Sequence, residues 1–201
     1  MLPAGLRREE WHALWNDVAE RSVRLGDESV IPVLEGVYQN PNSDPVLRDY
    51  AIQQLGLWLE IDSGPSGTTV RETVNGALDE RSLSTAGTAL LALNAVDESG
   101  TSADVSNKAA ELARNGSGGP ESGNQTTGLA VLADRNDPQA SVIARELLSD
   151  GKVAPSVKIA SIAAIGSQGD SSDVEWLKND YGSDPRYAAA VDAAVKKLQE
   201  N

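Results

Sequence analysis

The residue types best suited to chemistry gather near the N-terminus, where His12, the single histidine of the chain, lies between Trp11 and Trp15. A histidine can ligate a metal or activate a serine, but either role needs partner residues that the sequence does not place beside it. The chain has no cysteine, which excludes thiolate catalysis, disulfides and cysteine-type zinc sites. We therefore interpret His12 as a structural or surface residue and predict no catalytic residue and no metal site.

Three loops rich in Asp, Ser and Gly, at residues 62–64, 97–104 and 170–173, offer oxygen atoms of the kind that bind calcium. None has the spacing of an EF-hand or of a repeated calcium motif, so turns and helix caps are the favoured interpretation. The glycine-rich run at 116–119 lacks the Lys-Ser/Thr pair of a phosphate-binding loop and follows no strand. No pair of carboxylates stands in a context that marks a general acid and base. The sequence thus predicts neither an enzyme nor a cofactor.

Trp11, Trp15 and Trp58 form the other chemically distinctive set. Aromatic side chains can form a ligand platform or an interface hot spot. At helical spacing they favour a second role, which is to cover the exposed N-terminal end of a helical array. Both interpretations stay open, and Trp58 is kept as a candidate partner-binding residue.

The composition indicates what kind of element must position these side chains. The 201-residue chain is 40% hydrophobic, but it has no Phe and only 4% aromatic residues, so Ala, Leu, Val and Ile must form the core. Small side chains let helices approach closely. The apolar residues recur at helical spacing, and no hairpin turn joins two alternating runs, so we predict no strand.

The net charge of −13 and the pI of about 4.4 limit the choice of partner. Nucleic acid and anionic membranes attract clusters of Lys and Arg, so neither is predicted as a partner. An acidic surface fits solubility, a basic protein partner or a saline habitat. No stretch approaches the roughly 20 apolar residues of a membrane span, and residues 1–8 lack the profile of a signal peptide. The compartment and the oligomeric state stay open.

Helix signals recur along the whole chain. In the N-terminal run 7–25, one face is expected to carry Trp11, Trp15, Val18, Ser22 and Leu25. An Asp that caps a helix and a Pro that opens it recur at 44–45, 137–138 and 184–185, and capping-box spacing recurs at 69–72 and 172–175. Gly166 is expected to end the helix that begins at Pro155. The predicted helical pairs span 27–61, 68–96, 102–134, 137–166 and 171–199, and their inner helices begin near residues 45, 82, 123, 155 and 185.

Val30-Ile31-Pro32-Val33-Leu34, followed by the stretch from Asp44 to Ala51, resembles one helical pair of the HEAT-repeat family. Residues 160–174 are similar to the junction between its shorter units, of the phycobilisome-lyase type. The resemblance covers most of residues 28–199. It implies one all-α domain over residues 1–201, an α-α superhelix of about five helical hairpins behind an N-terminal capping helix. It also implies structural hydrogen bonds from Arg48 and Asp49 between repeats.

The family resemblance implies scaffolding and protein binding on a concave face, so we predict a non-catalytic protein–protein interaction module. The residues expected to be exposed on the inner helices are Asp49, Gln53, Gln54, Thr85, Thr88, Lys158 and Ser161. An acidic groove formed by these helices would favour a basic partner. Two alternatives stay open. One is a bilin-lyase-like protein, and the other is a repeat module of a larger, exported protein whose activity lies elsewhere.

Overall fold

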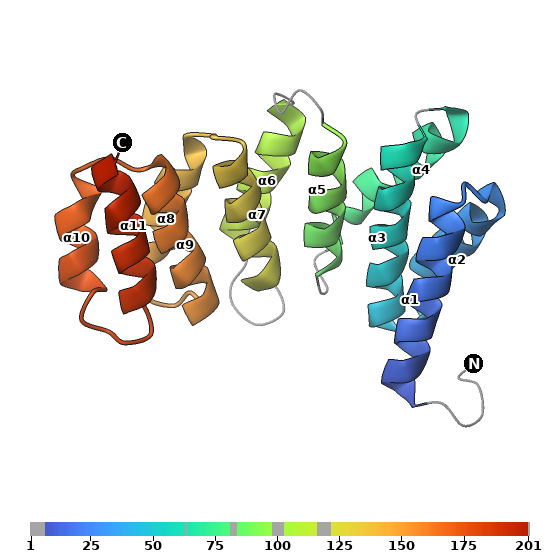
Figure 1. Cartoon of the computed structure of the whole chain (residues 1–201), viewed down its shortest axis with the longest axis horizontal. Helices are drawn as coiled ribbons and strands as arrows, with labels where there is room; N and C mark the ends of the chain where they lie inside the picture. The colour runs from blue at the N-terminus through green and yellow to red at the C-terminus, as the bar shows by residue number, and fades with distance from the viewer. Residues whose placement is uncertain (1–6, 63, 81–83, 98–102, 116–121, 201) are drawn as a thin grey trace. The chain divides into compact units, whose positions relative to one another are not determined.

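The computed structural model describes residues 7–62, 64–80, 84–97, 103–115 and 122–200 (Figure 1). Within these ranges the chain forms eleven α-helices and one 3-10 turn and no strand, which confirms the all-α prediction. No helix in the described ranges is long and apolar enough to cross a membrane. The chain divides into two compact units, an N-terminal unit of residues 1–98 and a C-terminal unit of residues 99–201.

In the N-terminal unit, one helix is central. The unit contains α1 (Arg8–Arg24), the 3-10 turn η1 (Glu28–Val30), α2 (Ile31–Gln39), α3 (Pro45–Ile61), α4 (Pro65–Ala77) and α5 (Thr85–Ala95). The carboxylate of Asp44 accepts a hydrogen bond from the backbone N–H of Val46, and Pro45 occupies the first turn, so α3 begins where the sequence predicts. Because α3 packs against α1, α2, α4 and α5, it is apolar on more than one side.

The C-terminal unit is built around α9. Its helices are α6 (Ala103–Asn115), α7 (Ser122–Asp134), α8 (Gln139–Ser149), α9 (Pro155–Gln168), α10 (Asp173–Asp180) and α11 (Ala188–Glu200). α9 packs against α7, α8 and α11, and Ile162 and Ile165 on α9 are fully buried. The two central helices, α3 and α9, therefore have the same role in their own units.

Consecutive helices pack in pairs within each unit. The packed pairs are α2–α3 and α4–α5 in the N-terminal unit and α6–α7, α8–α9 and α10–α11 in the C-terminal unit. The second helices of these pairs also contact one another within a unit, as α3–α5, α7–α9 and α9–α11. A HEAT-like array makes contacts of both kinds. The continuous superhelix over residues 1–201 stays a prediction.

Two glycines let the central helices approach their neighbours. A Cβ atom added to Gly56 of α3 would overlap the Cβ of Ala92 on α5, and one added to Gly166 of α9 would lie 2.7 Å from the Cα of Ala194 on α11. Each glycine lies eleven residues after the proline that opens its helix. The prediction that Gly166 ends its helix is wrong, because α9 continues to Gln168 and Gly166 is buried against α11.

The prediction of which residues of α1 face inward is also wrong. Val18 is 58% exposed and Leu25 is 77% exposed, whereas His12, Ala19 and Val23 are the buried residues of α1. The buried stripe is displaced from the predicted one because α1 contacts the rest of the unit mainly through α3. Ala19 and Val23, the buried apolar residues of α1, are small enough to allow close approach of a neighbouring helix.

Two helices begin at positions other than the predicted ones. α4 begins at Pro65, before the predicted capping box, because the carboxylate of Asp62 accepts a hydrogen bond from the N–H of Gly64 and closes the preceding turn. α11 begins at Ala188 and not at Pro185, because the N–H groups of Tyr187 and Ala188 both donate to the carbonyl of Asp184, at 2.9 and 3.0 Å, and close a turn before the helix. The predicted start near residue 82 lies outside the described residues.

Candidate functional site

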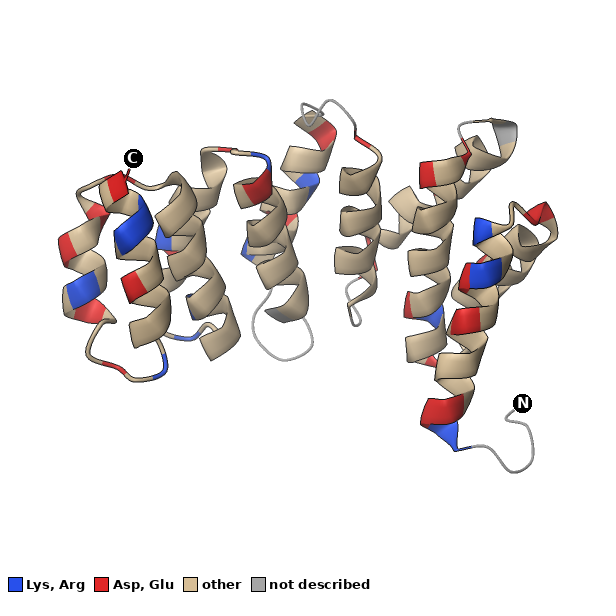
Figure 2. Cartoon of the chain, viewed as in Figure 1, with Lys and Arg blue, Asp and Glu red and all other residues tan. Residues whose placement is uncertain are grey.

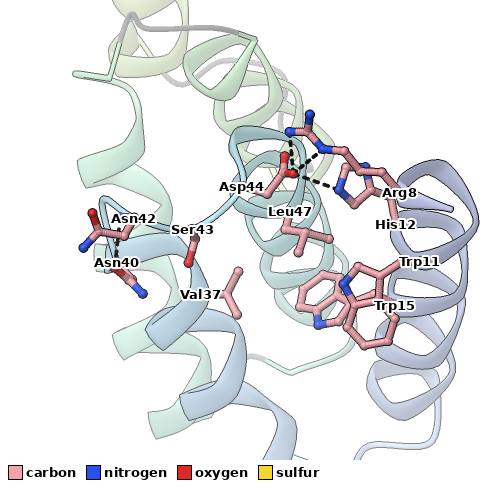
Figure 3. Close-up of a pocket in the computed structure, with 10 residues that line it drawn as sticks. All are labelled: Arg8, Trp11, His12, Trp15, Val37, Asn40, Asn42, Ser43, Asp44 and Leu47. Carbon is pink, nitrogen blue, oxygen red and sulfur yellow. Dashed lines mark hydrogen bonds and ion pairs between the residues drawn. The ribbon is translucent and has the colours of Figure 1, made fainter. Parts of the chain in front are cut away.

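A pocket of about 530 Å³ lies between α1, the end of α2 and the start of α3 in the N-terminal unit (Figure 3). Its lining combines aromatic, apolar and polar side chains. The residues that line it are Arg8, Trp11, His12, Trp15, Val37, Asn40, Asn42, Ser43, Asp44 and Leu47. A volume of this size is within the usual range for small-molecule sites.

Asp44 is the electrostatic centre of this pocket. Its Oδ2 atom accepts hydrogen bonds from Nε of Arg8 at 2.8 Å and lies 3.0 Å from Nε2 of His12, while Oδ1 accepts from the N–H of Val46 (Figure 3). Partial burial on its own would raise the pKa of Asp44, but the hydrogen bonds from Arg8, Val46 and His12 outweigh burial and lower that pKa. The carboxylate is therefore ionised, and its charge is balanced by Arg8.

His12 connects two helices. It is buried, and its ring nitrogen reaches from α1 to the carboxylate that caps α3. This contact supports the interpretation of His12 as a structural residue. Within the described part of the chain, no group of three or more His, Cys, Asp or Glu side chains is placed to hold a metal ion.

Trp11 and Trp15, one helical turn apart on α1, form the apolar side of the pocket. Both side chains are partly exposed, and they line the pocket together with Val37 and Leu47 (Figure 3). Trp58 does not join them. It is buried in α3, where its Nε1 donates to Oδ2 of Asp62 at 3.1 Å. The predicted set of three tryptophans is thus divided between a pocket wall and the core.

A second hollow, which we call the α3–α5 groove, has a volume of about 410 Å³ and lies on the other side of α3. It is lined by Gln53, Gly56, Leu57 and Glu60 from α3 and by Thr88, Leu91, Ala92 and Ala95 from α5. Beside the groove, the hydroxyl of Thr88 donates to Oδ1 of Asp49 at 2.8 Å. Three of the predicted partner-binding residues therefore meet here: Asp49, Gln53 and Thr88.

Four other predicted partner-binding residues are not exposed. Gln54, Trp58, Thr85 and Ser161 are all buried. Gln54 points toward α1, where its Nε2 donates to Oδ1 of Asn16 at 2.9 Å, and Ser161 is fully buried in α9. Because inner helices pack on more than one side, a polar residue next to an exposed position can point between helices. The prediction that Gln54, Thr85 and Ser161 are exposed is therefore wrong, and Trp58 lies in the core, which is one of the two interpretations left open for it. Lys158, on α9 of the C-terminal unit, is half-buried.

Arg48 is held by contacts within its own unit. Its guanidinium pairs with Glu80 at 2.6 Å, its Nε donates to the carbonyl of Tyr38 at 2.8 Å, and it lies over the Tyr38 ring. Burial raises the pKa of the Tyr38 phenol. Arg48 thus links α2, α3 and the segment after α4.

The acidic loops that were considered for calcium have structural contacts where they are described. Asp62 accepts from Trp58 and Gly64, and Asp170 accepts from the N–H of Ser172. The N–H and the hydroxyl of Ser172 both donate to Oδ1 of Asp170, so the predicted capping box at 172–175 does not form, and Asp173 is paired with Arg145. Residues 98–102 and 116–121, which include the predicted glycine-rich loop, lie outside the described residues.

Sequence reasoning missed the polar side of the N-terminal pocket. Asn40 and Ser43 belong to a linker that the sequence marks only as a break between helices, and Asp44 was interpreted only as a cap. The available signal was the spacing of Arg8 and His12, four residues apart on α1, opposite a linker rich in amides and hydroxyls.

The fold and its two hollows define an all-α protein with candidate binding sites in its N-terminal unit. No family model, curated protein or solved structure matches the chain. Membership of the HEAT-repeat family stays a prediction that rests on the sequence resemblance and on the helical pairs within each unit.

Proposed function

We propose that the protein is a non-catalytic interaction module that binds a basic segment of a partner protein in the α3–α5 groove. The observation that carries this proposal is the lining of the groove, which has an apolar floor, one carboxylate at Glu60 and no Lys or Arg. α5 has no charged residue along its length (Figure 2). A partner with apolar and basic side chains would match both properties.

The helices that form the groove are held in a fixed register. Asp49 contacts Thr88, and Gly56 faces Ala92 further along both helices, so α3 and α5 run in the same direction. Gly56 and Ala92 make the close contact between the two helices, and Leu57 and Leu91 are the larger apolar residues that line the groove. Leu91 is 51% exposed, which leaves apolar surface open to a partner.

The net charge of the chain supports a basic partner. At −13, the protein attracts cations over long range, which speeds the encounter at low salt. Glu60, at the edge of the groove, is placed to pair with a Lys or Arg after docking. The apolar floor then supplies contacts that are less sensitive to salt.

The proposal predicts selective binding of a basic amphipathic peptide. We expect a short peptide of Leu and Lys to bind the full chain and a matched peptide of Leu and Glu not to bind. Leu91→Lys should weaken the first interaction about tenfold or more, because it removes an apolar contact and introduces a charge of the same sign as the peptide. Isothermal titration calorimetry at low and moderate salt measures both effects.

Val33→Lys is the matched control for this substitution. Val33 lies on α2, is 56% exposed and does not line the groove, so the substitution adds the same charge to a similarly exposed apolar position. Equal weakening by Val33→Lys and Leu91→Lys would show that the peptide responds only to net charge, and would overturn the proposed site. Binding of the Leu and Glu peptide would overturn the proposed partner chemistry.

A further inference from the structure

We propose that the N-terminal pocket binds a carbohydrate residue, recognised as a neutral ring that has hydroxyl groups at its edge and C–H groups on its faces. This site is separate from the α3–α5 groove, and it does not depend on the function proposed there. The pocket brings together an aromatic wall, a charge-neutral ion pair and hydrogen-bonding groups that the protein leaves free. Each of these features selects for a different property of the ligand.

The charges inside the pocket favour a neutral ligand. Arg8 and Asp44 balance one another through contacts of 2.6 and 2.8 Å. A phosphate would have to compete with Asp44 for Arg8 and would be repelled by the carboxylate. A quaternary ammonium ion would meet the aromatic rings, but Arg8 beside them opposes a second cation. A neutral ligand that accepts from Arg8 and donates to Asp44 disturbs neither charge.

The aromatic wall favours a ligand with an extended apolar face. Trp11 and Trp15 line the same side of the pocket, and both rings are partly exposed to solvent. The C–H groups on one face of a pyranose ring can pack on an indole ring, whose face carries partial negative charge. Leu47 and Val37 extend the apolar surface. One face of the sugar ring would therefore pack on the tryptophan rings, and the hydroxyl groups at its edge would form hydrogen bonds with the polar side chains of the pocket.

The opposite side of the pocket supplies free polar groups. The side-chain carbonyl of Asn40 accepts from the backbone N–H of Asn42 at 3.0 Å, which turns the amide nitrogen toward the side of Val37 (Figure 3). Within the described chain, neither this nitrogen nor the hydroxyl of Ser43 has a protein partner. Amide and hydroxyl groups that are held in place but unpaired are suited to ligand hydroxyls.

Saturation-transfer difference NMR on the full chain tests the site with glucose, galactose, mannose and N-acetylglucosamine as probes. We expect transfer to the ring C–H protons of at least one probe. Trp15→Ala should reduce this transfer about fivefold or more, since it removes half of the aromatic wall. Asn40→Asp should reduce it to a similar extent. This substitution keeps the oxygen that accepts from Asn42, so the turn is retained while the donor is lost.

Matched control substitutions lie in the C-terminal unit. Trp176→Ala and Asn179→Asp change the same residue types on α10, outside the pocket, and should leave the transfer unchanged. The proposal is overturned if no probe shows transfer, or if transfer survives both Trp15→Ala and Asn40→Asp. It is also overturned if inorganic phosphate or tetramethylammonium binds at the pocket more tightly than every saccharide. Because Asn40→Asp preserves the turn, it remains informative even if Trp15→Ala fails to fold.

Discussion

We expect Arg145→Met to lower the free energy of unfolding by about 3 kcal/mol, because it leaves a buried carboxylate without its counter-ion. Asp173 is 4% exposed, and its two oxygens accept hydrogen bonds from Nε and Nη2 of Arg145 at 2.8 and 2.6 Å. The backbone N–H of Asp170 is the other donor to this carboxylate. The Arg145 side chain is 35% exposed, so water partly replaces it, and the loss is at the lower end of the usual range. Urea unfolding of the full chain, followed by circular dichroism, measures the change.

Arg186→Met is the control for this prediction. Arg186 also pairs with an aspartate, and its hydrogen bonds to Asp184 lower the pKa of that carboxyl to about 2. This pair lies at the surface, where water replaces the lost partner, so the substitution should change stability little. The double variant Arg145→Met with Asp173→Asn should recover part of the loss, since the buried charge is gone. Equal losses for the two arginine substitutions would contradict the argument from burial.

The ion pair of Arg145 and Asp173 also shows what a sequence pattern cannot predict. Residues 172–175 have the spacing of a capping box, so local reasoning assigns Asp173 to a helix start. Its partner lies on α8, 28 residues earlier in the chain. Asp173 is indeed the first residue of α10, but its pairing with Arg145 depends on how α8 lies beside that helix start, which no local pattern specifies. Local patterns therefore predicted the helices well, but they did not predict which polar residues pair across them.

The difference between local helix signals and contacts between helices also explains which inner-helix residues were predicted correctly. The start of α3 and its burial on several sides could be predicted, because the Asp-Pro cap and the two apolar stripes are local signals. The exposure of single polar residues could not be. Gln53 is exposed, while Gln54, the next residue, faces α1. On a helix packed on several sides, one step along the chain turns a side chain by about 100°, enough to bury it. The groove thus contains Gln53 and Thr88, while Gln54 and Thr85 belong to the interior.

Gly56→Ala should lower the free energy of unfolding by about 2 kcal/mol. The added methyl group would overlap the Cβ of Ala92, and neither atom can move without its helix. Overpacking of this kind costs about 1–3 kcal/mol, and the gain in helix propensity of up to about 1 kcal/mol offsets part of it. Thermal and urea unfolding of the full chain measure the loss.

Gly36→Ala and Ala92→Gly separate steric overlap from helix propensity. Gly36 lies within α2 with no atom near its missing Cβ, so Gly36→Ala should raise stability by about 0.5–1 kcal/mol. The double variant Gly56→Ala with Ala92→Gly moves the methyl group from one helix to the other, where a Cβ at residue 56 would lie 3.5 Å from the Cα of residue 92. The helix-propensity changes nearly cancel, so stability should return close to that of the unmodified chain.

If the double variant is instead less stable than Gly56→Ala alone, the contact between α3 and α5 does not depend on the space that Gly56 leaves. The α3–α5 groove would then need another source for its fixed register.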